Sequence, residues 1–433
     1  MSQKIDTIVV FEDGGFRDLL PLTYWRPTWA LRVGYGSLLE SMLPDGAFDG
    51  VQFACREVMA DVVAERSGRP VNVPPAGERV LFLNGRLLAT APVPLEAFFQ
   101  APAPSAQWWG KDLAILLADR ALAAQLTPEI LLDWKRVADF LADVPAVRFV
   151  KEPRLVRYPW DLVGANATML EAGWRRAGSP ARIEGRLCEG AYLLNAAAIH
   201  VGAGSTIKPG VVLDAENGPI FIGRNVTVCP NASIEGPCYI GDGSLIQPGA
   251  ALRDAMSVGP MSKLGGELES SIIHGFSNKQ HDGFLGHAYV AEWVNLAADT
   301  VNSDLKNTYG TVRVPINGVE VESGRQFVGL TVGDHAKTGI GQMFATGSVV
   351  GFGSNVASCS FAPKFVPSFA WVTDAGVVRY DLERCLDVAR RVMLRRGSQM
   401  TAAEERLFGQ LPLIAESIER NGRSSLDLAL AQG

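Results

Sequence analysis

The chain has 433 residues, of which 47% are apolar and 20% are charged, and its formal net charge is −6 at pH 7. The length predicts two to three domains, and the acidic balance argues against a nucleic-acid partner because phosphate neutralisation needs a basic face. The sequence has no run of about 18 uncharged apolar residues, and its six cysteines form no Cys-x-x-Cys pair. We therefore expect a cytoplasmic protein without a membrane segment, a disulfide framework or a zinc knuckle.

Residues 1–190 have the pattern of an α/β layer. Aliphatic and aromatic runs at 8–11, 79–83 and 147–150 predict buried strands, and the stretch 112–126 predicts a helix between two of them. Strands that alternate with helices indicate a Rossmann-like domain with helices packed on a sheet.

A glycine loop follows the first predicted strand. Gly14 and Gly15 are adjacent, Arg17 follows closely, and Arg26 lies a few residues further on. Glycines let backbone N–H groups approach a phosphate, and arginines add charge-assisted hydrogen bonds. With Asn84, which follows the second predicted strand, these residues are candidates for nucleotide or phosphate binding.

From Val201 onward, apolar residues recur every six positions. The repeat runs without a break from Ile222 to Leu264, is interrupted at 216–219, and resumes at Phe284 and again at Val332. A period of six matches neither an α-helix nor an isolated strand, and it predicts a triangular parallel β-helix in which each short strand points one aliphatic side chain inward. Chance periodicity is the alternative, and eight consecutive matches argue against it.

The pattern after Ala375 is helical. Apolar residues from Leu382 to Met393 share one helix face, and Thr401 with Glu404 has the spacing of a capping box that opens a second helix.

The glycine loop, with the Leu20-Pro21-Leu22-Thr23 element after it, resembles the signature loop of sugar-1-phosphate nucleotidyltransferases. Joined to a hexapeptide β-helix, it resembles the bifunctional UDP-N-acetylglucosamine pyrophosphorylase/glucosamine-1-phosphate N-acetyltransferase family, and more closely the divergent bacterial branch of that family. Further matching blocks are residues 83–86, 158–162 and 265–309.

The resemblance implies three parts: a nucleotidyltransferase-like α/β domain at 1–190, a left-handed parallel β-helix at 191–375 and a short α-helical tail at 376–433. The left hand comes from the resemblance and not from the spacing. The resemblance also implies acetyl-CoA as co-substrate and an amino sugar phosphate or a sugar nucleotide as partner. The flat faces of a triangular coil predict a homotrimer.

The first domain departs from the family pattern at its metal site. Where the family reads asparagine-glycine-aspartate and uses the aspartate to hold Mg²⁺, this chain reads Asn84-Gly85-Arg86. An arginine does not ligate a cation, so the sequence predicts no metal ligand here and weak or absent Mg²⁺-dependent nucleotidyl transfer.

In the second domain, the family spacing places the essential histidine fourteen residues before an asparagine, which identifies His281 and Asn295 as the candidate catalytic pair. A neutral imidazole can take the proton of an attacking amine. His287 is the rival, and a solvated loop histidine is the simpler alternative.

Four other residues are candidates for binding the substrate: Lys263, Lys279, Asn302 and Asp304. Solvated lysines and ordinary turn residues remain the alternatives for them. Glu269 stands where family members often place a phosphate-binding lysine, which bears on the identity of the acceptor.

Three functions follow from these observations. The first is acyl-CoA-dependent N-acylation of an amino sugar or its phosphate, with a divergent nucleotidyltransferase-like domain alongside. The second is sugar-1-phosphate nucleotidyl transfer with a β-helix that serves only for assembly, and the third is a non-catalytic protein that binds sugar nucleotides. The sugar, the nucleotide base and the acyl group are not specified by the sequence.

Overall fold

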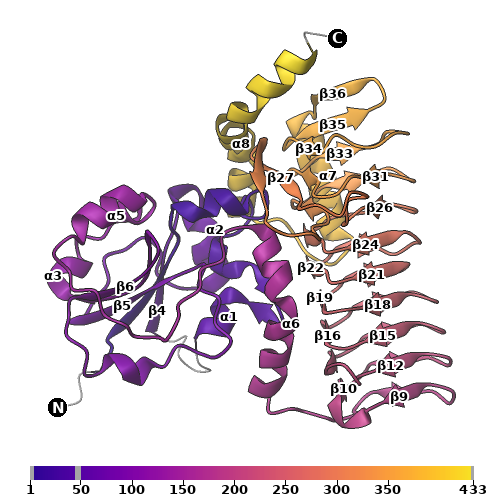
Figure 1. Cartoon of the computed structure of the whole chain (residues 1–433), viewed down its shortest axis with the longest axis horizontal. Helices are drawn as coiled ribbons and strands as arrows, with labels where there is room; N and C mark the ends of the chain where they lie inside the picture. Colours follow the sequence, from indigo (N-terminus) through magenta and orange to yellow (C-terminus); the bar gives the residue numbers. More distant parts are fainter. Residues whose placement is uncertain (1–3, 44–49, 431–433) are drawn as a thin grey trace.

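The computed structural model describes residues 4–43 and 50–430, with side chains described as far as Glu419. An α/β domain stands beside an upright β-helix, and a C-terminal helix lies near the upper ends of both (Figure 1). The expected α/β domain and β-helix are confirmed.

The α/β domain is built on a five-stranded sheet in the order β4-β1-β5-β7-β6, in which β1 is parallel to β4 and β5 while β7 is antiparallel to both of its neighbours. The strands are β1 (Thr7–Phe11), β4 (Val51–Ala54), β5 (Arg79–Asn84), β6 (Ser105–Trp109) and β7 (Asp112–Asp119), with a small ribbon of β2 (Arg32–Val33) and β3 (Gly36–Ser37). The helices are α1 (Leu38–Met42), α2 (Glu57–Ser67), α3 (Arg120–Ala123), α4 (Pro128–Leu131), α5 (Trp134–Phe140) and α6 (Pro159–Arg176).

The predicted strands at 8–11 and 79–83 are confirmed as β1 and β5. The predicted helix at 112–126 is wrong, because most of that stretch forms strand β7, which lies inside the sheet between β5 and β6. The side chains from Leu113 to Ala118 are at most 4% exposed. An uninterrupted apolar run of this length fits a strand buried on both faces as well as a helix, and the tertiary packing decides between them.

The predicted strand at 147–150 is not formed. The side-chain oxygen of Gln107 accepts hydrogen bonds from the backbone N–H groups of Phe149 and Val150, at 2.8 and 2.9 Å. These two backbone N–H groups are thus satisfied by a side chain, whereas in a strand they would donate to the backbone of a neighbouring strand.

The β-helix has three faces of stacked parallel strands. The first face is a nine-stranded sheet: β10 (Ile199–Val201), β13 (Ile220–Ile222), β16 (Cys238–Ile240), β19 (Met256–Val258), β22 (Ile272–Gly275), β25 (Tyr289–Glu292), β29 (Thr331–Val332), β32 (Val349–Val350) and β34 (Phe365–Val366). The second face contains β8 (Arg186–Leu187), β11 (Thr206–Ile207), β14 (Thr227–Val228), β17 (Leu245–Ile246), β20 (Lys263–Leu264) and β23 (Asn278–Lys279), and it continues upward into β30 (Lys337–Thr338), β33 (Asn355–Val356) and β35 (Ala370–Thr373), with β36 (Gly376–Arg379) added antiparallel to β35. The third face contains β9 (Tyr192–Leu194), β12 (Val212–Asp214), β15 (Ser233–Glu235), β18 (Ala251–Arg253), β21 (Glu267–Glu269) and β24 (Phe284–Gly286), followed by β26 (Val301–Asn302) and β31 (Met343–Phe344).

The six-residue register predicts the interior of this coil. The side chains of Ile222, Ile240 and Leu264 are fully buried, as are most other residues of the repeat. The register is displaced by one residue where it resumes, because Leu285 is fully buried while Phe284 is only half-buried. A hairpin of β27 (Arg313–Ile316) and β28 (Val319–Glu322) is inserted between later turns.

The C-terminal segment joins the two bodies. Helix α7 (Leu382–Leu394) buries the predicted face, and helix α8 (Ala402–Leu430) begins at the predicted capping box of Thr401 and Glu404. Helix α8 packs against α2 of the α/β domain, where Arg66 and Glu404 form an ion pair at 2.8 Å. The tail thus fixes the two domains to one another.

The first face of the β-helix packs against the α/β domain through α6, which contacts β19 and β25. Arg26 crosses this boundary and forms ion pairs with Asp334 at 2.5 Å and Glu292 at 2.9 Å. The α/β domain therefore covers the first face, and ligand sites are expected on the other two faces.

Candidate functional site

The glycine loop forms part of a cavity of about 770 Å³ at the end of β1. Gly14, Gly15 and Arg17, which were predicted to act together, all line it. The other side chains on its wall include the cations Lys111, Arg136 and Arg157, the aromatic groups Trp109 and Trp134, and the carboxylates Asp18, Glu129 and Asp133. The arrangement has the size and the donors of a site for an anionic small molecule.

Arg86 lines this cavity and forms ion pairs with two of its carboxylates. Its guanidinium donates to both oxygens of Asp13, at 2.7 and 2.5 Å, and to Asp112 at 3.0 Å. Burial by itself lowers the pKa of Arg86, but the charges of Asp13 and Asp112 outweigh it and raise that pKa above its ordinary value. Two carboxylates that could have ligated a cation are thus neutralised by a side chain of the chain itself.

The glycine loop packs against this arginine. A Cβ atom added at Gly15 would lie 2.4 Å from Cζ of Arg86, and the backbone N–H of Gly15 donates to Asp13 at 3.1 Å. Asn84 is fully buried and donates to Asp13 and to the carbonyl of Leu113, both at 2.8 Å. In this arrangement Gly15 and Asn84 support the ion pair.

Arg26 lies away from this cavity. It is 2% exposed and fully engaged between Asp334, Glu292 and the carbonyl of Leu22. The structure thus places it at the boundary between the two domains, apart from Gly14 and Arg17.

The predicted β-helix residues fall on two different faces. Lys263 and Asn295 lie on the second face, where both line a smaller cavity. Asn302 and Asp304 lie where the third face turns toward the first, in contact with the segment that carries His287. The structure therefore separates residues that were predicted to act together.

His281 occupies the turn between β23 and β24. It is exposed, and within the described part of the chain its imidazole makes no hydrogen bond. Lys279 supports this turn from inside, because its ammonium donates to the carbonyls of His281 and Asp282 at 2.5 and 2.8 Å. Burial lowers the pKa of Lys279 to about 8.

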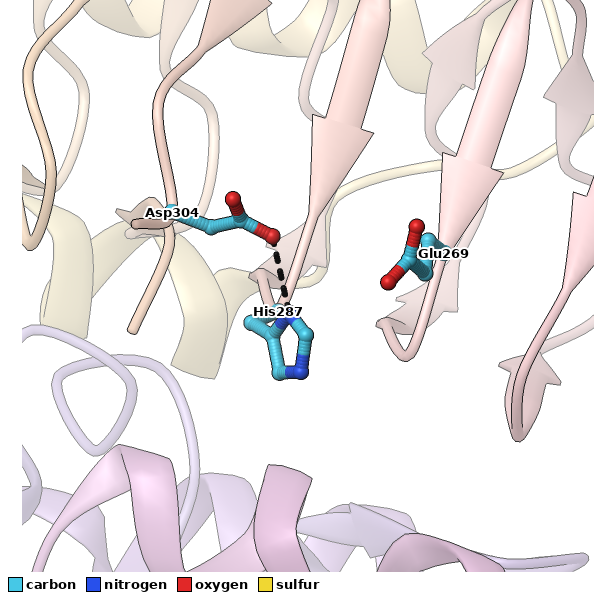
Figure 2. A group of neighbouring side chains, drawn as sticks. All are labelled: Glu269, His287 and Asp304. Atoms are coloured by element: carbon cyan, nitrogen blue, oxygen red, sulfur yellow. Dashed lines mark hydrogen bonds and ion pairs between the residues drawn. The ribbon is translucent and has the colours of Figure 1, made fainter. Parts of the chain in front are cut away.

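His287 is held by a carboxylate on the next turn of the coil. Its Nδ1 lies 2.8 Å from Oδ2 of Asp304, and the imidazole stacks on Phe327 with ring centroids 5.1 Å apart. Figure 2 shows the ring between Asp304 on one side and Glu269 on the other, with its other nitrogen turned away from Asp304. The side chain of His287 is 22% exposed, so that nitrogen can be reached.

The neighbouring residues fix this geometry. Asn302 exchanges two hydrogen bonds of 3.0 Å with the backbone of Gly286, immediately before His287. One ligand atom each from Glu269, His287 and Asp304 lies within 4.8 Å of the others, a spacing that also suits a divalent cation. Arg253 pairs with Glu269 at 2.8 Å and competes for that carboxylate.

A signal for the pair of His287 and Asp304 was present in the sequence. Three hexads make one turn, so residues about eighteen positions apart lie on adjacent turns, and these two are separated by seventeen. The predicted pair of His281 and Asn295 was placed by the family spacing of fourteen instead.

Comparisons with known proteins support both domains. Residues 8–176 match the family model described as sugar nucleotidyl transferase, and residues 219–254 match the bacterial transferase hexapeptide model. A bifunctional sugar-1-phosphate nucleotidylyltransferase/acetyltransferase of Sulfurisphaera tokodaii is 32% identical over 106 residues, which cover 24% of this chain and 26% of that protein. The bifunctional protein GlmU of Heliobacterium modesticaldum is 29% identical over 160 residues, covering 33% of this chain and 34% of that protein.

The UDP-N-acetylglucosamine acyltransferase from Campylobacter jejuni is a solved structure similar to part of the chain. It is 14% identical with a TM-score of 0.25, and the match covers 52% of this chain and 95% of that one. No helix among the described residues is long and apolar enough to cross a membrane.

These matches show, in one chain, a domain similar to sugar nucleotidyl transferases and a segment of bacterial transferase hexapeptide repeats. The expected resemblance to the bifunctional nucleotidyltransferase/acetyltransferase family is confirmed at the level of both domains. The matched segments span about a quarter to a third of the length of these relatives.

Proposed function

We propose that the β-helix domain transfers an acyl group from an acyl-CoA to the amine of an amino sugar or amino sugar phosphate. The observation that carries this proposal is the imidazole of His287, bonded through Nδ1 to Asp304 and open to solvent on its other side. The hexapeptide match and the acetyltransferase names of the relatives support the reaction class.

The proposed chemistry needs one base. With Nδ1 donating to Asp304, Nε2 of His287 is the acceptor in the neutral ring and takes a proton from the amine as its nitrogen attacks the thioester carbonyl. The new N–C bond forms, the C–S bond breaks, and the leaving thiolate receives the proton. Asp304 holds the tautomer and stabilises the transient imidazolium, as carboxylates do beside catalytic histidines.

The charge around His287 favours an amine as acceptor. Asp304 and Glu269 flank the imidazole and attract an ammonium group, which releases one proton to solvent before the neutral amine attacks and gives its second proton to His287. The same two carboxylates would repel a phosphate of the acceptor, so that phosphate must lie further from His287.

His281 remains the second candidate for the base, because it stands at the family spacing before Asn295. It lacks a carboxylate partner among the described residues, whereas His287 has one. An orienting partner normally accompanies a histidine that acts as general base, so the geometry favours His287.

For the α/β domain, we propose ligand binding without metal-dependent nucleotidyl transfer. The large cavity presents both cations and carboxylates together with two tryptophans, a mixture that suits the phosphate, hydroxyl and base groups of a sugar nucleotide, and Arg86 supplies positive charge where the family holds Mg²⁺. The reaction would therefore be confined to the β-helix domain.

The test is a product screen with purified protein, acetyl-CoA, several nucleoside triphosphates and a panel of hexosamines and their phosphates, read by mass. The reaction that appears is then measured with His287→Ala, His281→Ala and Asp304→Asn. We expect His287→Ala to lower turnover by about 10² to 10⁴-fold and His281→Ala to have a much smaller effect. Loss of turnover in His281→Ala alone would assign the base to His281, and the absence of any acyl transfer would refute the function.

A further inference from the structure

A second cavity, of about 280 Å³, lies between the second face of the β-helix and the end of helix α7. Its floor is a column of residues on successive turns: Lys263 pairs in register with Asn278, Asn278 bridges to Asn295, and Asn295 bridges to Lys337. The site of His287 lies elsewhere, where the third face turns toward the first.

Four cations line this cavity: Lys263, Lys337, Arg395 and Arg396. None of the residues recorded on its wall is an aspartate or a glutamate. Burial lowers the pKa of Lys337 to about 8, and burial together with the charge of Arg395 lowers the pKa of Arg396. A cation that is buried without a counter-charge destabilises the protein, and an anion beside it would offset this cost.

The polar groups of the cavity are arranged as donors. Arg396 donates to the side-chain oxygen of Asn278, whose amide group in turn donates to Oδ1 of Asn295 at 3.2 Å. This chain of bonds uses the oxygens and leaves the amide N–H groups of Asn295 without an acceptor among the described residues. The ammonium of Lys263 also has no acceptor there, and that of Lys337 has only the carbonyl of His335, at 2.9 Å.

We propose that this cavity binds the phosphate group of a small molecule. A phosphate oxygen accepts several charge-assisted hydrogen bonds at once, which matches two lysines, an arginine pair and an asparagine amide converging without a carboxylate. Helix α7 is part of the site, since the cations of its C-terminal end close the cavity over the column on the β-helix. The proposal does not depend on acyl transfer.

Two sources of phosphate fit this chemistry, namely the phosphates of a coenzyme A and the phosphate of a sugar phosphate. The probes are therefore inorganic pyrophosphate, coenzyme A and glucosamine 1-phosphate, each titrated calorimetrically into the full-length protein at low salt. Of the three probes, the one that binds most tightly identifies the source of the phosphate. Binding should weaken as the ionic strength rises.

The test variant is Lys263→Gln combined with Lys337→Gln. The matched control is Lys208→Gln, because Lys208 is a half-buried lysine that follows β11 on a lower turn of the same face and does not line the cavity. We expect the double variant to bind its probe at least tenfold more weakly and the control to bind as the parent does. Without ligand, the melting temperature of the double variant should equal or exceed that of the parent, because the buried ammonium of Lys337, which has no carboxylate partner among the described residues, has been removed.

Absence of measurable binding of all three probes to the parent would overturn the proposal. It would also fail if the double variant bound the probe as tightly as the Lys208→Gln control. A double variant that melts well below the parent would show that the lysines stabilise the fold. In that case the single variant Lys263→Arg, which keeps the charge, would have to bind the probe as the parent does for the proposal to stand.

Discussion

Replacing Arg86 by methionine should destabilise the α/β domain strongly. The substitution keeps much of the side-chain volume but removes the guanidinium that neutralises Asp13 and Asp112. Arg86 is 1% exposed, while the two carboxylate side chains are 11% and 18% exposed. Breaking a buried ion pair by removing one partner typically costs about 3 to 5 kcal/mol, and the partial access of water to the aspartates places the expected loss near the lower end, about 3 kcal/mol.

The free energy of unfolding would be measured by urea denaturation, followed by tryptophan fluorescence. Arg120→Met is the matched control, because Arg120 and Glu78 form an ion pair in which both side chains are more than 70% exposed. We expect this control to change stability by less than about 1 kcal/mol. A loss below about 1 kcal/mol for Arg86→Met would refute the view that Arg86 is the essential counter-charge of this cavity.

Arg86→Asp tests the same reasoning from the side of the metal. Three carboxylates would then face one another, which should destabilise the domain until a divalent cation binds among them. Added Mg²⁺ is expected to raise the melting temperature of Arg86→Asp and to leave that of the parent unchanged. An equal rise in the parent, or robust nucleotidyl transfer by the parent that EDTA abolishes, would show that Arg86 does not replace the metal.

Four further predictions follow. His287→Ala should lower acyl transfer by about 10² to 10⁴-fold and His281→Ala much less, as measured by initial rates with the acceptor from the product screen. The protein should be a homotrimer, and a monomer in light scattering at micromolar concentration would contradict this. Stability should fall as the pH drops below about 6.5, because burial lowers the pKa of His335 far below its ordinary value, so protons bind the unfolded chain first; thermal melts of His335→Phe across pH 5 to 8 should show a flatter slope. Ile240→Ala, at a fully buried position of the coil, should lower the free energy of unfolding by about 2 to 5 kcal/mol, and a loss under about 1 kcal/mol would indicate that the interior collapses around the cavity.

The acid response of His335 comes from its surroundings. Both ring nitrogens are buried and find no hydrogen-bond partner in the part of the chain that the structure describes. Aromatic rings from three parts of the chain surround the imidazole: Trp25 of the α/β domain, Phe352 of the β-helix and Phe408 of helix α8. Acid should therefore weaken the junction between the domains first. The pKa of the buried His274 is also lowered, by burial and then by the charge of Arg26, and contributes in the same direction.

The β-helix and the residues of its interior could be predicted from the amino-acid pattern alone. A period of six is a local property, since each short strand repeats the same inward position, and residues such as Ile222 and Leu264 could be assigned to the core without knowledge of their neighbours. The same holds for the capping box of Thr401 and Glu404, whose two bonds join residues three positions apart. The sequence also showed an arginine at position 86 where the family pattern has a metal-binding aspartate. The side chain of an arginine does not ligate a metal cation, so this inference needed no structure.

Contacts between side chains that are distant in the sequence could not be predicted in this way, because they depend on how the elements pack. Leu113 to Ala118 have the same apolar run in a helix or in a buried strand, and the sheet around β7 selected the strand. Arg26 lies twelve positions after Gly14, and nothing local shows that its partners are Asp334 and Glu292, some three hundred residues away. The separation of seventeen residues between His287 and Asp304 fits one turn of the coil and could be read from the sequence, but the fold decided that the two side chains face one another, with Nδ1 of His287 2.8 Å from Asp304.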